Sequence, residues 1–492
     1  MAKSNTNNTQ QAAWIAIGGL FSFGFTIVSS MILSRYFDKA DYGTYRQVLY
    51  VYHTMLSVFT LGLPKAFSYF LPRVEPQQAK SLISKITNIF FVLGGLFSIS
   101  LYLGSPLIAD LMNNQDLVNA LKIFAIVPLL LLPTMGLEGI LATFRKTKLM
   151  AAYTIITRLV MLVSVSLPVI IFNAGYEYAL IGFVASSFFS FLLALYLKYY
   201  PVKDQKKESC NTSYKEIFSF SLPILYASLW GMLIQSADQF FVSRYFGKSI
   251  FAEFANGSTE LPFVGMILGA CSAVLSPIFS RMSHEHVDPQ KEVLPLWLSV
   301  FEKTVKLTYP LILYCWFFAD TIMVFLYGEK YEESNTYFRI KLITYIFTLI
   351  MYGPLMINSG RVKYYANVHM FTAIAVILLE YFSILLFNSA YAISITSMLC
   401  QLGKTTVLLW GVSKYFELRI DKLFPIPVMF KIIIPSALFL YLEHYFFQIY
   451  LSGIGVIWIL IVSLCLYMTC FYIYSLIAHL DYYKITRPLI KK

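Results

Sequence analysis

Long apolar segments follow one another along this chain and decide what it can fold into. Runs of about 20 or more mostly apolar residues recur from end to end, separated by polar segments of at most about fifteen residues. A helix of about 20 apolar residues is long enough to cross the hydrocarbon core of a bilayer. The chain is 58% hydrophobic and only 13% charged, whereas a soluble domain has about 45–50% apolar and about 25% charged residues. These values exclude an ordinary soluble domain and predict an all-α, polytopic integral membrane protein.

The apolar runs predict about fourteen transmembrane helices. No connection between them is long enough to fold as a domain. The predicted helices lie at about residues 12–34, 46–70, 82–109, 117–143, 149–172, 176–199, 215–242, 253–280, 297–327, 337–359, 364–387, 390–413, 426–449 and 453–479.

The basic residues between the helices predict the orientation of the chain. The net charge is +12, but it is spread over short connections, as in a membrane protein, and does not form a nucleic-acid-binding surface. One alternate set of connections holds about 25 Lys and Arg residues and the other about 9. Because cytoplasmic loops carry the excess of positive charge, we expect both termini in the cytoplasm.

An internal repeat divides the chain. The segment Ser34–Lys39 (SRYFDK) matches Ser243–Lys248 (SRYFGK), and the register continues through Tyr45 and Phe254. Each copy lies at the outer end of the first hairpin of a six-helix block, which predicts two parallel repeats related by an axis along the membrane normal. The predicted divisions are an N-terminal lobe at 1–199, a basic cytoplasmic linker at 200–214, a C-terminal lobe at 215–414, and a last helix pair with a basic tail at 415–492.

Ionisable residues inside the predicted helices are the candidate functional groups. Each costs about 2.5–3.5 kcal/mol in the bilayer on insertion scales, so each needs a partner, a water-filled cavity or a function. The candidate cations for an anionic substrate are three deep residues and two at the outer mouth: Lys65, Arg158, Lys404, Arg46 and Arg244. Snorkelling of Lys65 to the inner interface is the structural alternative for that residue.

Acidic residues are candidates for ion or proton binding, or for pairing with these cations. We single out Asp238, Glu260, Glu138 and Glu380. Glu138 is a candidate partner of Arg158, and Glu380 a candidate partner of Lys404. Lys306 and Glu302 are four residues apart, which is the spacing of an ordinary helix-surface pair.

Other chemistry has little support in the sequence. His284-Glu285-His286 lacks a third ligand, the six cysteines show no metal-ligand spacing, and no phosphate loop or nucleotide-binding fingerprint is present. We therefore expect no metal, catalytic residue or resident cofactor, with H⁺ or Na⁺ coupling through Asp238 or Glu260 left open.

Three segments resemble bacterial polysaccharide flippases, the O-antigen or Wzx-type members of the MOP exporter superfamily. The segments are Leu33–Tyr45, Tyr214–Pro223 (YKEIFSFSLP) and Ala319–Tyr331 (ADTIMVFLYGEKY). The likeness covers essentially the whole chain, including the final helix pair. It implies a transporter, not an enzyme, that moves an undecaprenyl-diphosphate-linked oligosaccharide for O-antigen, lipopolysaccharide, capsule or exopolysaccharide from the inner to the outer leaflet. Its expected partners are the lipid-linked oligosaccharide, membrane lipids and other polysaccharide assembly proteins.

Several related functions remain open at this point. A lipid II flippase shares fourteen helices and a cationic cleft, a multidrug exporter of the same superfamily favours an acid-rich cleft, and a teichoic-acid precursor flippase differs only in its glycan. A membrane polysaccharide polymerase or ligase belongs to another class, and such enzymes tend to carry a large periplasmic loop that this chain lacks.

Overall fold

The computed structural model describes residues 8–205, 208–450 and 455–482, which form helices and turns without a strand. The chain consists of two compact units, residues 1–252 and 253–492, each described here by itself. Lys3, Lys206, Lys207 and the basic tail used in the orientation count lie outside the described residues. The division into units falls within a helix rather than at residues 200–214, and the repeat-based boundaries stay a prediction.

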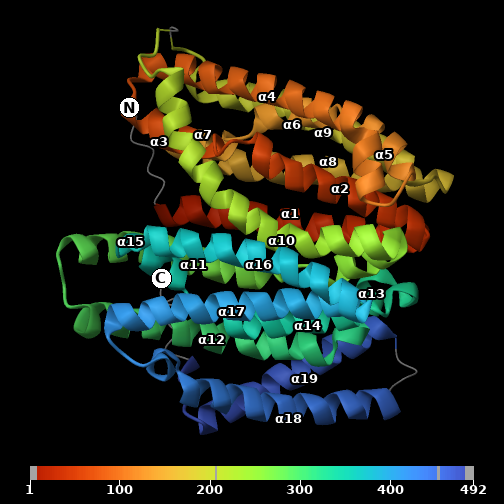
Figure 1. Ribbon diagram of the computed structural model, residues 1–492, viewed down its shortest axis with the longest axis vertical. Coiled ribbons are helices and arrows are strands. Elements are labelled where there is room, and N and C mark those ends of the chain that lie inside the picture. The colour runs from red at the N-terminus through yellow and green to blue at the C-terminus, as the bar shows by residue number, and fades with distance from the viewer. Residues whose placement is uncertain (1–7, 206–207, 451–454, 483–492) are drawn as a thin grey trace. The chain divides into compact units, whose positions relative to one another are not determined.

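Among its described residues, the first unit contains helices α1 to α9 and most of helix α10 (Figure 1). Helix α8 packs against both α1 and α9, and α4 packs against α5 and α6. The helices are α1 Asn8–Tyr36, α2 Lys39–Phe59, α3 Pro64–Phe70, α4 Pro76–Leu111, α5 Asp116–Phe124, α6 Val127–Leu131, α7 Leu137–Thr143, α8 Thr147–Phe172, α9 Tyr176–Tyr199 and α10 Tyr214–Gly257.

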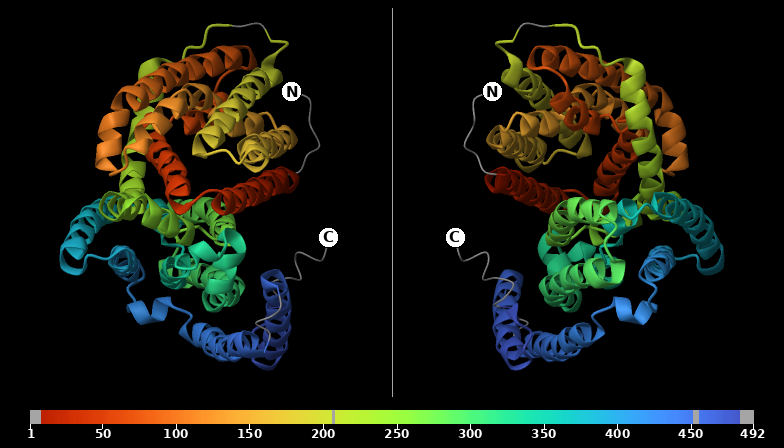
Figure 2. Two further views of the ribbon diagram at one scale, coloured as in Figure 1. Left: turned by 90° about the vertical axis from the view of Figure 1, so that its right-hand side faces the viewer. Right: turned by 90° about the vertical axis from the view of Figure 1, so that its left-hand side faces the viewer.

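In the second unit α17 packs against α14 and α16, and α12 packs against α18. Helices α18 and α19 lie side by side near the C-terminal end of the chain (Figure 2). The helices are α11 Pro262–His284, α12 Leu294–Phe317, α13 Ala319–Tyr327, α14 Ser334–Thr348, α15 Tyr352–Asn358, α16 Val362–Phe387, α17 Ala390–Phe416, α18 Ile426–Tyr450 and α19 Val456–Ile477.

The membrane-protein class is confirmed. Eleven helices in the described part of the chain are long and apolar enough to cross a membrane, or up to 13 spans if each of two bent pairs counts as one. Large apolar side chains point outward on several of them, among them Phe172, Leu386 and Ile477, which are 73%, 75% and 73% exposed. Such a surface is stable against lipid and not against water. The expected number of fourteen spans is not reproduced.

The predicted helix at 46–70 is interrupted after Phe59, and α3 begins only at Pro64. Leu61 and Gly62 in the break have positive φ angles of 48° and 69°. An α-helix cannot continue through such a conformation, and the proline provides a pre-set start for the next helix.

Other predicted spans are also broken. The segment predicted at 117–143 is divided into α5, α6 and α7, with Gly136 at φ 78° before α7. The span predicted at 297–327 bends by 76° between α12 and α13, and that at 337–359 bends by 43° between α14 and α15. Apolar composition predicts where the chain enters the bilayer, but it is insensitive to breaks inside an apolar run.

Candidate functional site

The repeated segment has the same helix break in both copies. Helix α1 ends at Tyr36, and Asp38 then caps α2 by accepting a hydrogen bond from the amide of Asp41 at 2.7 Å. At the matching position in α10, Gly247 has non-helical φ and ψ angles of 79° and 177°. Thus the element predicted as a helix at 215–242 followed by a loop is in fact α10, which continues to Gly257 with a kink.

Beyond this break, α2 packs closely on the last part of α10 in the first unit. A Cβ on Gly43 would lie only 2.0 Å from the carbonyl oxygen of Lys248. A buried hydrogen-bond network joins the helices, in which the Gln47 amide donates to Ser243 Oγ at 2.6 Å and the Asn114 amide donates to Gln47 Oε1 at 2.6 Å. Because buried amides need partners, this network fixes the register of α2 against α10.

The two cations at this end of α10 are engaged by other helices of the same unit. The Arg244 guanidinium donates to the backbone carbonyl of Asp110, in the last turn of α4, where a helix end attracts positive charge. Lys248 forms an ion pair with Asp116 of α5. The predicted substrate cation Arg244 therefore has a structural partner in this conformation.

Two of the predicted substrate cations, Arg46 of α2 and Arg158 of α8, both interact electrostatically with His53. Arg46 donates to the Tyr42 hydroxyl at 3.2 Å. Both Arg46 and Arg158 act electrostatically on His53 of α2, and Arg158 also acts on Tyr52. The side chains of Arg158 and His53 are exposed.

No ion pair joins Arg158 to Glu138 within the described part of the chain, although the sequence offered this pair as an alternative. The guanidinium of Arg158 instead donates weakly to Met161 Sδ at 3.6 Å. Glu138 is exposed in the first turn of α7. Arg158 thus presents a charge that no carboxylate of the described residues neutralises, which is the arrangement required to receive an anion.

Lys65 lies at the start of α3, next to a tightly packed break. Its side chain is exposed. A Cβ on Gly62 would lie 2.7 Å from the carbonyl oxygen of Ser221, and the rings of Tyr69 and Phe220 stack at 4.0 Å. Lys65 is therefore held beside the contact between the α2–α3 break and the beginning of α10.

The acid predicted in α10 also lies in the first unit. Asp238 accepts a hydrogen bond from the amide of Gln239 at 2.7 Å and has further interactions.

In the second unit, Lys404 of α17 donates to Gln401 Oε1 at 3.1 Å, and it forms no ion pair with Glu380 among the residues that the structure describes. Glu380 is fully buried. The charge of Lys341 on α14 acts on Lys404, and Lys404 acts on His369 of α16. Lys341 and His369 were not selected from the sequence, because only the packing of α14 and α16 beside α17 brings them to Lys404.

The position expected for Glu260 is wrong. We predicted it inside the helix at 253–280, but it lies in the turn between α10 and α11, which begins at Pro262. The proline fixes the start of α11, and Glu260 is exposed before it. Glu260 acts electrostatically on Tyr345 of α14.

The pair between Lys306 and Glu302 is confirmed, with Nζ and Oε1 2.7 Å apart. The Lys306 side chain is only 10% exposed, so the pair is not on the helix surface. Replacing Lys306 by alanine should lower the thermal unfolding temperature by a few degrees while leaving transport per protein molecule unchanged. Unfolding of the purified variant and a transport assay normalised to membrane protein check this result, and a transport defect with normal stability would contradict it.

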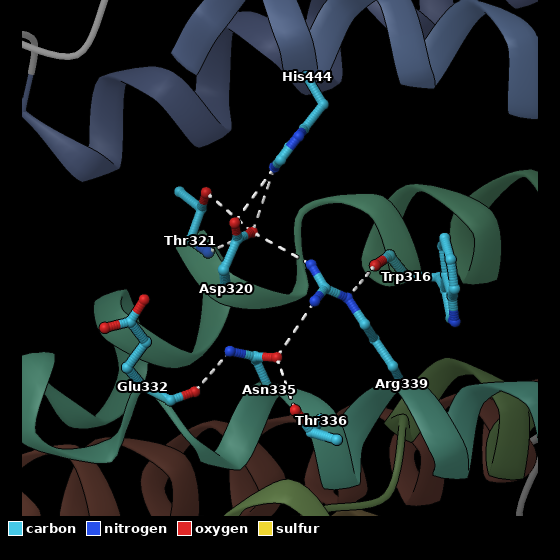
Figure 3. Close-up of polar contacts among 8 residues, drawn as sticks. All are labelled: Trp316, Asp320, Thr321, Glu332, Asn335, Thr336, Arg339 and His444. Carbon is cyan, nitrogen blue, oxygen red and sulfur yellow. Dashed lines mark hydrogen bonds and ion pairs between the residues drawn. The ribbon is translucent and has the colours of Figure 1, made fainter.

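A polar cluster in the second unit joins α13, α14 and α18 (Figure 3). Asp320 Oδ2 lies 3.2 Å from His444 Nε2, and Asp320 Oδ1 lies 3.8 Å from Arg339 Nη2. Arg339 also donates to the Trp316 carbonyl at 3.1 Å and to Asn335 Oδ1 at 3.2 Å. The hydropathy pattern gave no indication of this cluster, because its members come from three separate segments.

The described residues contain no group of three or more His, Cys, Asp or Glu side chains that is placed to hold a metal ion. They do include an apolar pocket of about 260 Å³ between α18 and α19, with Leu442, Tyr467 and Phe471 in its lining.

Comparisons with known proteins agree with this architecture. A curated relative, the capsular polysaccharide biosynthesis protein CapF of Staphylococcus aureus, is 25% identical over 195 residues, which are 38% of this chain and 46% of the relative. The chain thus matches about half of that relative's length.

Two solved structures share the fold. The lipid II flippase MurJ in an inward closed conformation has a TM-score of 0.71 at 16% identity, over 97% of this chain and 99% of MurJ. An inward-facing multidrug transporter of the MATE family, in the MOP superfamily, has a TM-score of 0.58 at 12% identity, over 84% of this chain and 95% of the transporter. The model of the family described as "Polysaccharide biosynthesis protein" matches residues 32–336. The chain therefore belongs to this family of polysaccharide biosynthesis proteins.

Proposed function

We propose that the protein is a flippase that carries an undecaprenyl-diphosphate-linked oligosaccharide from the inner to the outer leaflet of the bacterial plasma membrane, with both termini in the cytoplasm. The family match over residues 32–336 carries this proposal. The fold shared with a lipid II flippase over nearly the whole chain supports the lipid-linked class of substrate. The glycan is one used for a cell-surface polysaccharide such as capsule or O-antigen.

The chemistry of the substrate fits the cations. A diphosphate cannot cross hydrocarbon unaided, and fixed cations replace part of its lost hydration. Arg158 offers an exposed guanidinium without a carboxylate partner among the described residues, and Lys65 and Lys404 are the other proposed contacts. The apolar pocket between α18 and α19 suits part of a prenyl chain.

The membrane potential suffices to drive this transport in the proposed direction. Moving two negative charges outward across a potential that is negative inside gains about 4–5 kcal/mol per 100 mV, at about 2.3 kcal/mol per charge. An ion counterflow through Asp238 or Glu260 is compatible with this energy source but is not required by it.

The test is a reconstituted transport assay. Proteoliposomes containing the protein and a prenyl-diphosphate-linked oligosaccharide are given an inside-negative potential, and glycan on the outer face is measured with an impermeant lectin. We expect protein-dependent appearance of the glycan, reduced by Lys65→Ala and by Lys404→Ala. Glycan that stays inside with the wild-type protein, under either polarity of the potential, would refute the proposal.

A further inference from the structure

The second unit contains a buried carboxyl group that the proposed transport mechanism does not use. Glu443 of α18 is 5% exposed, and neither of its carboxyl oxygens has a hydrogen-bond partner among the described residues. It lies within a helix that is long and apolar enough to span the membrane. An ionised carboxylate without a partner in such surroundings is very costly, so the position is stable only when the charge is removed.

The neighbouring polar groups are already engaged with one another. The Tyr314 hydroxyl of α12 is within 2.9 Å of both Ser463 Oγ and the Leu460 carbonyl oxygen of α19. The Tyr467 hydroxyl donates to Ser436 Oγ at 2.9 Å. Glu443 acts electrostatically on both tyrosines, yet neither hydroxyl bonds to it. Within the part of the chain that the structure describes, no side chain donates a hydrogen bond to the Glu443 carboxyl group.

A more exposed polar cluster begins at the residue that follows this acid in the chain. The next residue, His444, has an 18% exposed side chain and contacts Asp320, which is 24% exposed. Asp320 in turn contacts Arg339, which is 32% exposed (Figure 3). This cluster brings partly exposed polar groups to the residue that follows Glu443 along α18.

We propose that Glu443 is a proton-binding site among the packed helices α12, α18 and α19. The carboxylate takes up one proton from solution to become the neutral acid, and releases the same proton when the site opens. The titratable side chains on which Glu443 acts are Tyr314 on α12 and Tyr467 on α19. His444 follows Glu443 along α18 and pairs with Asp320 of α13.

Proton binding here has a mechanical consequence. With Glu443 neutral, α18 packs on α12 without a buried charge. Loss of the proton places a charge between α12, α18 and α19, which favours separation of these helices or entry of water. The position of the α18–α19 pair is thereby linked to protonation. If the protein transports as proposed above, this link also makes transport depend on pH, a step that rests on the proposed function.

The direct test does not require transport. Purified protein in ²H₂O is followed by infrared difference spectroscopy between acidic and alkaline solution, at the carbonyl band of protonated carboxyl groups. We expect a band in the wild-type protein that is lost in Glu443→Gln and kept in Glu285→Gln, whose side chain is exposed. Glu443→Leu should fold at least as well, because its side chain suits the apolar surroundings, and should lack the band as well. Equal spectra for the wild type and both Glu443 variants would overturn the proposal.

A second readout separates this proposal from the transport function. The thermal unfolding temperature is measured at a series of pH values. We expect it to fall with rising pH, and to fall more steeply in the wild type than in Glu443→Gln. This direction follows because the folded state holds a proton that the unfolded chain releases. In proteoliposomes, Glu443→Gln should weaken the response of transport to a pH gradient. If the wild type transports nothing, the proposed function fails while the infrared result still decides the proton site. If transport occurs and the infrared and unfolding differences are absent, the proton site fails alone.

Discussion

Arg158→Ala should reduce transport of the lipid-linked oligosaccharide by about ten- to hundredfold while leaving the protein in the membrane. Hydrogen bonds to charged groups contribute about 1.5–3 kcal/mol, and about 1.4 kcal/mol corresponds to a factor of ten. Arg158 is the strongest candidate for such a contact, because its guanidinium is exposed and forms no ion pair with a carboxylate of the described residues. Removing it should not unfold the protein, since it forms no ion pair within the described part of the chain.

Arg158→Lys is the informative companion variant. It keeps the charge but loses the two-pronged geometry with which arginine binds phosphate, so we expect transport between that of the alanine variant and that of the wild type. Lys306→Ala is the matched control, since it removes a cation that already has a carboxylate partner. Equal losses for Arg158→Ala and Lys306→Ala, or wild-type transport with Arg158→Ala, would contradict the assigned role.

Gly43→Ala should cause the second large effect, through the packing of α2 on α10. The added Cβ would lie 2.0 Å from the Lys248 carbonyl oxygen and 2.7 Å from the carbonyl carbon. These are backbone atoms, which cannot rotate away, so the helices must separate. Overpacking of this kind costs about 1–3 kcal/mol, and we expect the buried network of Gln47 and Ser243 to become accessible and transport to fall about tenfold.

Cysteine labelling measures this separation. Ser243→Cys should react with an impermeant maleimide much faster when combined with Gly43→Ala than alone, because Ser243 is fully buried. Gly95→Ala is the matched control, since a Cβ on Gly95 meets no atom within 4 Å. Unchanged labelling together with normal transport would show that the contact between α2 and α10 tolerates the extra carbon.

The sequence predicted the membrane class and most helix positions, because hydropathy reports directly on transfer into lipid. It did not predict where apolar runs break. The break at Leu61 and Gly62 had a local signal in the Gly-Leu-Pro sequence, since glycine permits a positive φ angle and proline starts a helix. The 76° bend between α12 and α13 had no such signal, since Phe317, Phe318 and Ala319 are ordinary membrane residues.

The candidate site was predictable in its residue types but not in its contacts. Deep cations are conspicuous in an apolar sequence, and Arg158 and Lys404 were found in that way. The hydrogen bond from Arg244 to the Asp110 carbonyl at the end of α4 depends on tertiary packing, which the local sequence does not indicate. Lys198, near the end of the helix predicted at 176–199, shows the same limit, because nothing in the local sequence indicates its burial. Its side chain is wholly buried, with Nζ 3.5 Å from Thr87 Oγ1 and 4.8 Å from the centre of the Phe67 ring.

The matched helix breaks at Asp38 and Gly247 also constrain how the two copies of the repeat can be exchanged by engineering. Asp38 has an ordinary φ of −69° and supplies a side-chain cap, whereas Gly247 has a φ of 79°. Grafting the first copy onto the second would force an aspartate into an extended conformation with positive φ that is essentially restricted to glycine, at a cost of about 1–3 kcal/mol, while the reverse graft would lose only a cap. Exchange of the two segments should therefore be better tolerated in one direction than in the other.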